Sequence, residues 1–188
     1  GQSIAFGTEQ GVDYSITDAG PIYPDVRFIR TAALLTHELI VFVDQVQAAK
    51  PSTLDISYHQ LGAWNSLPPG NPWPSPSMPG YKYIQQATTR TVGEDGLVLK
   101  TSVLDDWQPT IVLAGGDPSE IITGYGILKT TEQRVPWLLQ RRRAQATAFV
   151  WALCLDGAVV KLSVSAVQNA QGRPLSRAAE PRRLAEHA

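Results

Sequence analysis

The chain has 188 residues and a formal net charge of −1, with 43% apolar and 18% charged residues. This length allows one domain with a substantial core and is too short for two domains of ordinary size. The composition excludes a disordered chain, and the near-neutral charge gives no overall electrostatic reason to bind nucleic acid. No apolar run approaches the ~20 residues that span a bilayer, so no membrane partner is expected.

The single cysteine, Cys154, cannot form an intrachain disulfide and does not by itself define a metal site. It lies inside an apolar run, which predicts a buried and unreactive thiol. The compartment is therefore not fixed by cysteine usage.

The first elements in chain order are two short strands, predicted over residues 2–7 and 12–17. Gly7 and Gly11 separate them. Residues 18–24 contain Gly20-Pro21 and Tyr23-Pro24, which predict turn geometry.

Three β-rich runs follow between residues 26 and 64, with short breaks predicted at residues 36–38 and 48–51. The first two runs are typical of a hairpin, because β-branched and aromatic residues flank a break of a few residues. Side chains alternate between the two faces of a strand, so the third run has one apolar and one polar face. The apolar face carries Leu54, Ile56 and Tyr58, and the polar face carries Asp55, Ser57 and His59.

A long loop is predicted over residues 65–80, where six prolines remove backbone donors and fix φ. Loops of this length are usually functional or disordered. Aromatic residues at and within the loop, Trp64, Trp73, Tyr81 and Tyr83, argue against disorder.

The rest of the chain predicts further short strands and a polar tail. The strands are expected at residues 82–86, 88–92, 97–104, 110–113, 121–128, 137–141, 146–155 and 159–167. Hairpin turns are expected at residues 93–96 and at Asp156-Gly157, and residues 168–188 form the tail. Many short strands without helical periodicity predict an all-β, multi-stranded antiparallel β-sandwich of more than a dozen strands.

The central stretch resembles a known family. The matching residues are Arg30, Leu34, Leu35, residues 39–44, Val46, Pro51, Leu54, Asp55, Tyr58, His59, Gly62 and Trp64. This pattern is similar to the C-terminal β-sandwich of the heparinase II/III-like polysaccharide lyases, which include alginate and glycosaminoglycan lyases. A second, weaker likeness covers residues 135–153.

The resemblance implies that residues 1–167 are a supersandwich-like β-sandwich domain, truncated at its N-terminus, of a periplasmic or secreted protein. It implies an acidic polysaccharide or oligosaccharide as the partner. The family's α/α toroid, which supplies most catalytic groups, is absent from this chain. No catalytic residue is therefore assigned, and the chain alone is expected to lack meaningful lyase activity.

The reaction implied by the resemblance is β-elimination on a uronic acid. The proton at C5 is weakly acidic, so the neighbouring carboxylate must be neutralised before a base removes it. The reaction also requires a general acid that protonates the leaving oxygen.

The resemblance also implies a divalent metal, zinc or calcium, with His59 as one ligand. Its aspartate ligand would be Asp13 or Asp18, of which Asp18 is taken as the candidate, and a further histidine would lie before residue 1. Imidazole and carboxylate ligands suit zinc. The alternative is that His59 only forms a hydrogen bond at the strand end.

Three side chains are candidates for substrate binding. Trp64 and Trp73 could stack on sugar rings, or they could simply pin the proline-rich loop. Arg141, in the run Arg141-Arg142-Arg143, could pair with uronate carboxylates through its guanidinium fork, or it could be solvated beside a turn.

The sequence leaves three functions open: the sandwich part of a lyase, a stand-alone carbohydrate-binding sandwich, and a purely structural domain. A lyase sandwich should expose the apolar surface that its toroid covers. A stand-alone binding module should begin at the start of a strand and remain soluble alone.

Overall fold

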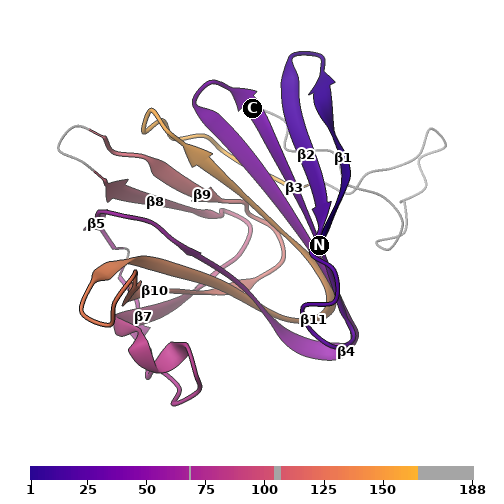
Figure 1. The fold of residues 1–188 in the computed structure, drawn as a ribbon. Helices are drawn as coiled ribbons and strands as arrows, with labels where there is room; N and C mark the ends of the chain where they lie inside the picture. The colour runs from indigo at the N-terminus through magenta and orange to yellow at the C-terminus, as the bar shows by residue number, and fades with distance from the viewer. Residues whose placement is uncertain (68, 104–106, 165–188) are drawn as a thin grey trace.

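The computed structural model describes residues 1–67, 69–103 and 107–164 (Figure 1). The described part is an all-β, antiparallel fold, as predicted from the strand spacing. Its elements are β1 (Gln2–Glu9), β2 (Val12–Asp18), β3 (Val26–Thr36), β4 (Leu39–His59), β5 (Ala63–Ser66), β6 (Asn71–Pro72), a 3-10 turn (Tyr81–Tyr83), β7 (Gln85–Val92), β8 (Leu97–Ser102), β9 (Thr110–Leu113), β10 (Ser119–Ile127) and β11 (Arg134–Cys154). Nothing helical in these residues has the length and apolarity to cross a bilayer.

The strands β4 and β11, each of 21 residues, run through the whole molecule and pair with each other along their length. The first half of β4 pairs with β3, and the end of β11 pairs with β9, which continues to β8 and β5. The start of β11 pairs with β10, which continues to β7 and β6. The hydrogen-bonded sheet therefore divides into two layers, which diverge from the shared pair β4 and β11 (Figure 1).

The two layers close on an apolar core, which makes the fold a sandwich. Trp64, Leu99 and Ile111 of the first layer pack in one cluster with Val92 and Ile121 of the second. Leu138 and Trp151, from the two ends of β11, complete this cluster. Burial of this area is the main favourable contribution to joining the layers.

The outer faces of both layers are covered as well. On the first layer, Val41, Val150 and Cys154 pack against the partly buried Val160 and against Leu162. Cys154 is buried, as predicted, and burial raises the pKa of its thiol. On the second layer, Trp137 and Leu139 pack beneath the loop that carries Trp73 and Tyr81.

The break predicted at residues 48–51 is wrong, because β4 is continuous there. The register of the β4 and β11 ladder shifts between Ala144 and Ala146, whose partners are Ser52 and Gln47. Pro51 lies in this gap, where no hydrogen bond to β11 needs its missing N–H. The two strands expected at residues 137–141 and 146–155 are likewise the single strand β11.

Two predicted hairpins are also wrong, because the strands beside each turn have other partners. The turn at residues 93–96 forms, with the Gly96 amide donating to the Gly93 carbonyl, but β7 pairs with β6 and β10 while β8 pairs with β5 and β9. After the turn at Asp156-Gly157, β11 has no free edge, since β4 and β9 flank its end. Residues 157–164 therefore form one parallel bridge, Ser163 to Gly115, instead of a strand.

The structure describes eleven strands, fewer than the dozen or more expected. Residues 165–167 and the predicted tail 168–188 lie outside the described residues.

Candidate functional site

The end of β4 has the two faces that the alternation predicted. Leu54 is buried and Ile56 is partly buried in the inner cluster around Phe149, and the Tyr58 ring lies 5.2 Å from the Trp151 ring. Asp55 lies on the opposite face and pairs with Arg141 of β11. The polar face of this strand is therefore the outer face of the second layer.

Arg141 and Asp55 form a bidentate ion pair on this outer face. Nε and Nη2 of Arg141 each donate a hydrogen bond of 2.9 Å to the Asp55 carboxylate. The Tyr81 hydroxyl donates to the same carboxylate, and Glu120 lies 3.8 Å from Arg141 Nη1. The hydrogen bond to Asp55 is the main cause that raises the pKa of Arg141 above its usual value. Asp55 thus occupies Nε and Nη2 of the guanidinium group that is a candidate for binding a uronate.

Burial, together with the hydrogen bond to Asp55, raises the pKa of Tyr81. Burial raises the pKa of Tyr58 to about 12, and its hydroxyl donates to Gln60 Oε1 at 2.6 Å. Both phenols are therefore protonated at neutral pH and act as hydrogen-bond donors in this structure.

Trp73 is held in the same outer-face cluster. Its ring lies 6.0 Å from the Tyr81 ring in an edge-on arrangement and 6.4 Å from the Trp137 ring. The Arg141 guanidinium lies 6.0 Å from the centre of the Trp73 ring. These contacts agree with the alternative that Trp73 pins the proline-rich loop to the sheet.

Trp64 lies in the core between the layers. Only 9% of it is exposed, and its indole Nε1 donates a hydrogen bond of 2.8 Å to the Gly124 carbonyl. Its ring therefore has no free face for a sugar. The sequence placed it beside a loop but could not show that β10 would cover it.

The structure does not bring His59 and Asp18 together. His59 is exposed at the end of β4, whereas Asp18 pairs through Ile29 with Gln45, in the other half of β4. Figure 1 shows the end of β2 beside the N-terminus and the end of β4 near β5. These two residues do not fit a shared metal site, and in residues 1–67, 69–103 and 107–164 no three His, Cys, Asp or Glu side chains form a group that could hold a metal ion.

Both candidate aspartates have protein partners. Asp18 accepts hydrogen bonds from the Gly20 amide at 2.8 Å and from Arg27 Nε at 3.3 Å, and the Gly20 hydrogen bond is the main cause that lowers its pKa. Asp13 accepts a hydrogen bond from the Thr8 hydroxyl.

A buried ion pair on the inner face of the first layer was missed by sequence reasoning. Asp44 is 0% exposed, accepts hydrogen bonds from Arg30 Nε and Nη2, and accepts a third of 3.0 Å from the Trp151 indole. The Arg30 guanidinium also lies 5.7 Å from the centre of the Phe42 ring, which stacks on Trp151 at 4.1 Å. A charged residue within the apolar run of residues 39–44 was the available signal, because a buried carboxylate requires a partner.

Comparison with solved structures finds similar folds, while no protein-family model and no curated protein matches the sequence. The heparan sulfate lyase HepC from Pedobacter heparinus superposes with a TM-score of 0.57 at 10% identity, over 90% of this chain and 24% of that chain. A heparinase III, the BT4657 gene product, superposes with a TM-score of 0.55 at 12% identity, over 85% of this chain and 22% of that chain. The chain thus shares its fold with a part of these lyases and spans about a quarter of their length.

Proposed function

We propose that this chain is the β-sandwich part of a polysaccharide lyase that cleaves uronic-acid-containing polysaccharide by β-elimination, with the catalytic α/α toroid outside these 188 residues. The observation that carries the proposal is the fold likeness to two heparan-sulfate-type lyases over 85–90% of the chain. The sequence pattern of residues 26–64 resembles the same family, while no family model matches the sequence as a whole.

The exposed apolar side chains near the start of the chain support a domain interface. Phe6 of β1 is 79% exposed, and Ile4, Ile22 and Tyr23 are exposed in the same part of the chain. Backbone register places the start of β1 next to Asp18 at the end of β2, beside the turn that carries Ile22 and Tyr23. Exposed apolar residues are typical of a surface that another domain covers. We propose that the toroid packs here.

The chemistry of the described residues is consistent with a supporting role. Elimination at C5 requires a base and a cation that neutralises the uronate carboxylate. Tyr58 and Tyr81 stay protonated, and Arg141 and Arg30 are each paired with an aspartate. In this proposal the toroid supplies base and acid, and the sandwich supports it and lines one wall of the cleft.

A second candidate is a carbohydrate-binding β-sandwich that acts without catalysis. The same paired charges and protonated tyrosines agree with it equally well. The exposed apolar side chains of Ile4 and Phe6 on β1 favour the lyase part, because a self-sufficient module has no domain to cover them. A periplasmic or secreted location is proposed for both candidates, because extracellular polysaccharide is the substrate in each.

The deciding experiment is an ultraviolet assay for unsaturated uronate on heparan sulfate, hyaluronan and alginate. A longer protein that includes the preceding segment is compared with the 188-residue chain. Activity of the long form alone supports the lyase part. If neither protein has lyase activity but a polymer still binds, the chain is a carbohydrate-binding module instead.

Metal binding is proposed only for the longer protein, with His59 as one ligand and the others outside the described residues. No step of the reaction is assigned to it. Elemental analysis for zinc and calcium should show lower content in His59→Ala than in His37→Ala, the matched control. Equal metal content in both variants removes His59 from the site.

A further inference from the structure

The segment of residues 73–84 lies over the outer face of the second layer, beside β7 at the periphery of the molecule (Figure 1). We call this segment the strap. Its backbone is tied to the sheet where the Trp73 amide donates a hydrogen bond of 2.9 Å to the Ala87 carbonyl. The other backbone hydrogen bonds that the described residues give it are internal, such as that from the Ile84 amide to the Tyr81 carbonyl. The strap is therefore held mainly by its side chains.

The Tyr81 hydroxyl makes a polar contact between the strap and the sheet. It donates to the Asp55 carboxylate, which Arg141 also holds through two hydrogen bonds of 2.9 Å. The Arg141 guanidinium lies 5.8 Å from the centre of the Tyr81 ring and 6.0 Å from the centre of the Trp73 ring. The bidentate ion pair thus provides a fixed acceptor for a donor that the strap carries.

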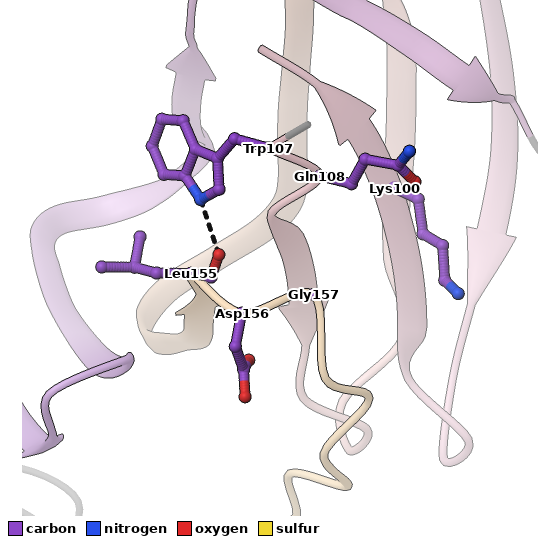
Figure 2. Close-up of a pocket in the computed structure, with 6 residues that line it drawn as sticks. All are labelled: Lys100, Trp107, Gln108, Leu155, Asp156 and Gly157. Atoms are coloured by element: carbon purple, nitrogen blue, oxygen red, sulfur yellow. Dashed lines mark hydrogen bonds between the residues drawn. The ribbon is translucent and has the colours of Figure 1, made fainter. Parts of the chain in front are cut away.

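Trp73 contributes ring contacts, and its indole has no hydrogen bond to the described residues. Its ring meets Tyr81 edge-on at 6.0 Å and lies 6.4 Å from the Trp137 ring. Trp107, in contrast, is tied through Nε1 to the Leu155 carbonyl at 2.6 Å, as Figure 2 shows. Ring contacts of the kind that hold Trp73 are individually weak and act over short distances. They are therefore lost together when the strap moves away.

Both ends of the strap adjoin weak points of the sheet. Before it, β6 has two residues, and Pro72 has no N–H to donate. After it, the register of β7 against β10 shifts between the pairs at Gln85 and Thr88, and Gln86 lies in this gap. Gln86 has a φ of 51°, in the left-handed region that residues other than glycine rarely adopt. The strap can therefore move about these two points with little change in the regular part of β7.

The strap covers an apolar patch on the outer face of the second layer. The patch consists of Ile122 of β10 and of Trp137 and Leu139 of β11, which are all buried. β10 and β11 pair with each other along these residues, and neither strand pairs with the strap. The patch would therefore stay in place and face solvent if the strap lifted away.

We propose that the strap opens as one unit while the β-sandwich stays folded, and that the hydrogen bond from Tyr81 to Asp55 is its latch. Opening breaks that bond and the ring contacts of Trp73, and it exposes the apolar patch beside Arg141. Segments with few hydrogen bonds to their surroundings open locally at a lower free energy than the whole fold. The strap belongs to the fold itself, so this device does not depend on the proposed function.

The test is native-state hydrogen exchange of the 188-residue chain, followed by NMR under conditions in which the opening equilibrium determines the rate. The Trp73 and Ile84 amides report on the strap, and the Val43 amide in β4 reports on global unfolding. The two strap amides should be equally protected, and each should be at least about tenfold less protected than Val43. Low concentrations of urea should accelerate exchange at Val43 and leave the strap amides unchanged, because strap opening exposes little surface.

Two variants separate the latch from the global fold. Tyr81→Phe should speed exchange of both strap amides about tenfold, as expected for loss of a hydrogen bond to a carboxylate. Tyr83→Phe, in the same turn, is the matched control, because its hydroxyl has no hydrogen bond to the described residues, and it should leave the strap amides unchanged. Arg30→Met destabilises the core and should speed exchange at Val43 about a hundredfold without changing the strap amides.

Strap amides that are as protected as Val43, or that urea or Arg30→Met accelerates together with it, overturn the proposal, because the strap then opens only with the whole fold. Unequal protection of Trp73 and Ile84 overturns the opening as one unit, and unchanged exchange in Tyr81→Phe overturns the latch. Each of these outcomes leaves the lyase assay on the longer protein unaffected, so failure of the strap and failure of the proposed function are distinguishable.

Discussion

Arg30 holds the buried carboxylate of Asp44 by two hydrogen bonds, from Nε at 2.6 Å and from Nη2 at 2.9 Å. The two partners differ in environment, because 40% of the Arg30 side chain is exposed and none of the Asp44 side chain is. Removing Arg30 therefore leaves a charge in the core that water cannot reach.

The first prediction is that Arg30→Met lowers the free energy of unfolding by about 3 kcal/mol, the cost of leaving one member of a buried ion pair alone. The control is Arg27→Met, which breaks the exposed pair with Asp18 and should cost about 0.5 kcal/mol. Urea denaturation measures both. Similar losses for the two variants would show that Asp44 is stabilised without Arg30.

The second prediction concerns the alkaline stability of the fold and Tyr58. Burial raises the pKa of Tyr58 to about 12, whereas an unfolded tyrosine titrates near 10. Between these values the unfolded chain binds fewer protons than the folded chain, so stability falls as pH rises from about 10 to about 12. Below about pH 10 the contribution of Tyr58 to the free energy of unfolding is fully present.

Tyr58→Phe removes this contribution, and its stability should decline less steeply than that of the wild type between pH 10 and about 12. Urea midpoints at half-unit pH steps measure the slope. Tyr23→Phe, at an exposed tyrosine, is the matched control. A Tyr58→Phe slope equal to the wild-type slope contradicts the assignment.

The third prediction compares two glycines with similar backbone geometry. Gly62 has a φ of 105° and Gly11 a φ of 80°, but a Cβ at Gly62 would lie 2.0 Å from the Ser102 carbonyl oxygen, while a Cβ at Gly11 meets nothing within 4 Å. Gly11→Ala should therefore cost only the backbone strain, about 1 kcal/mol. Gly62→Ala should cost roughly 2 kcal/mol more, because the chain must move apart.

Thermal and urea denaturation of the two alanine variants give the difference directly. Equal destabilisation would mean that the segment between β4 and β5 can shift away from Ser102 at little cost.

The fourth prediction separates a structural role of Arg141 from a substrate role. Arg141→Gln removes both charge-assisted hydrogen bonds to Asp55 and should lower the free energy of unfolding by about 2 kcal/mol. Arg143→Gln, at the exposed arginine two positions later, should be close to neutral.

The affinity of folded Arg141→Gln for a hyaluronan hexasaccharide should match that of the wild type. Unchanged stability together with lost affinity would restore Arg141 as a uronate ligand and would rule out the structural role given to it above.

The local sequence pattern predicted which side chains of a strand point into the core. It did not predict which strands pair with one another. The alternation from Leu54 to His59 fixed which side chains point inward, because the period of a strand is two residues. The alternation carries no information on what lies across the sheet. Asp55 therefore looked free in the sequence, although Arg141, 86 residues later, pairs with it.

The same limit applies to the tryptophans, and it explains the error at the predicted break at residues 48–51. Trp64 and Trp107 both lie close to loops, and only the position of distant strands buries one and exposes the other. Pro51 is compatible with a strand end or with a gap in a ladder, and the shift in β11 between Ala144 and Ala146 decides between them. Sequence reasoning thus found the all-β class and missed the continuity of β4 and β11.

Because β4 and β11 are continuous, they determine how the folded protein can unfold. Since β4 and β11 each belong to both layers, neither layer can detach without breaking strands that hold the other. The sandwich should behave as one cooperative unit, with amide protons of Val43 and Tyr58 exchanging through the same global opening. The pairing also joins residues 39–59 to residues 137–154, so this ladder forms only after a long loop has closed, and folding is expected to be slow.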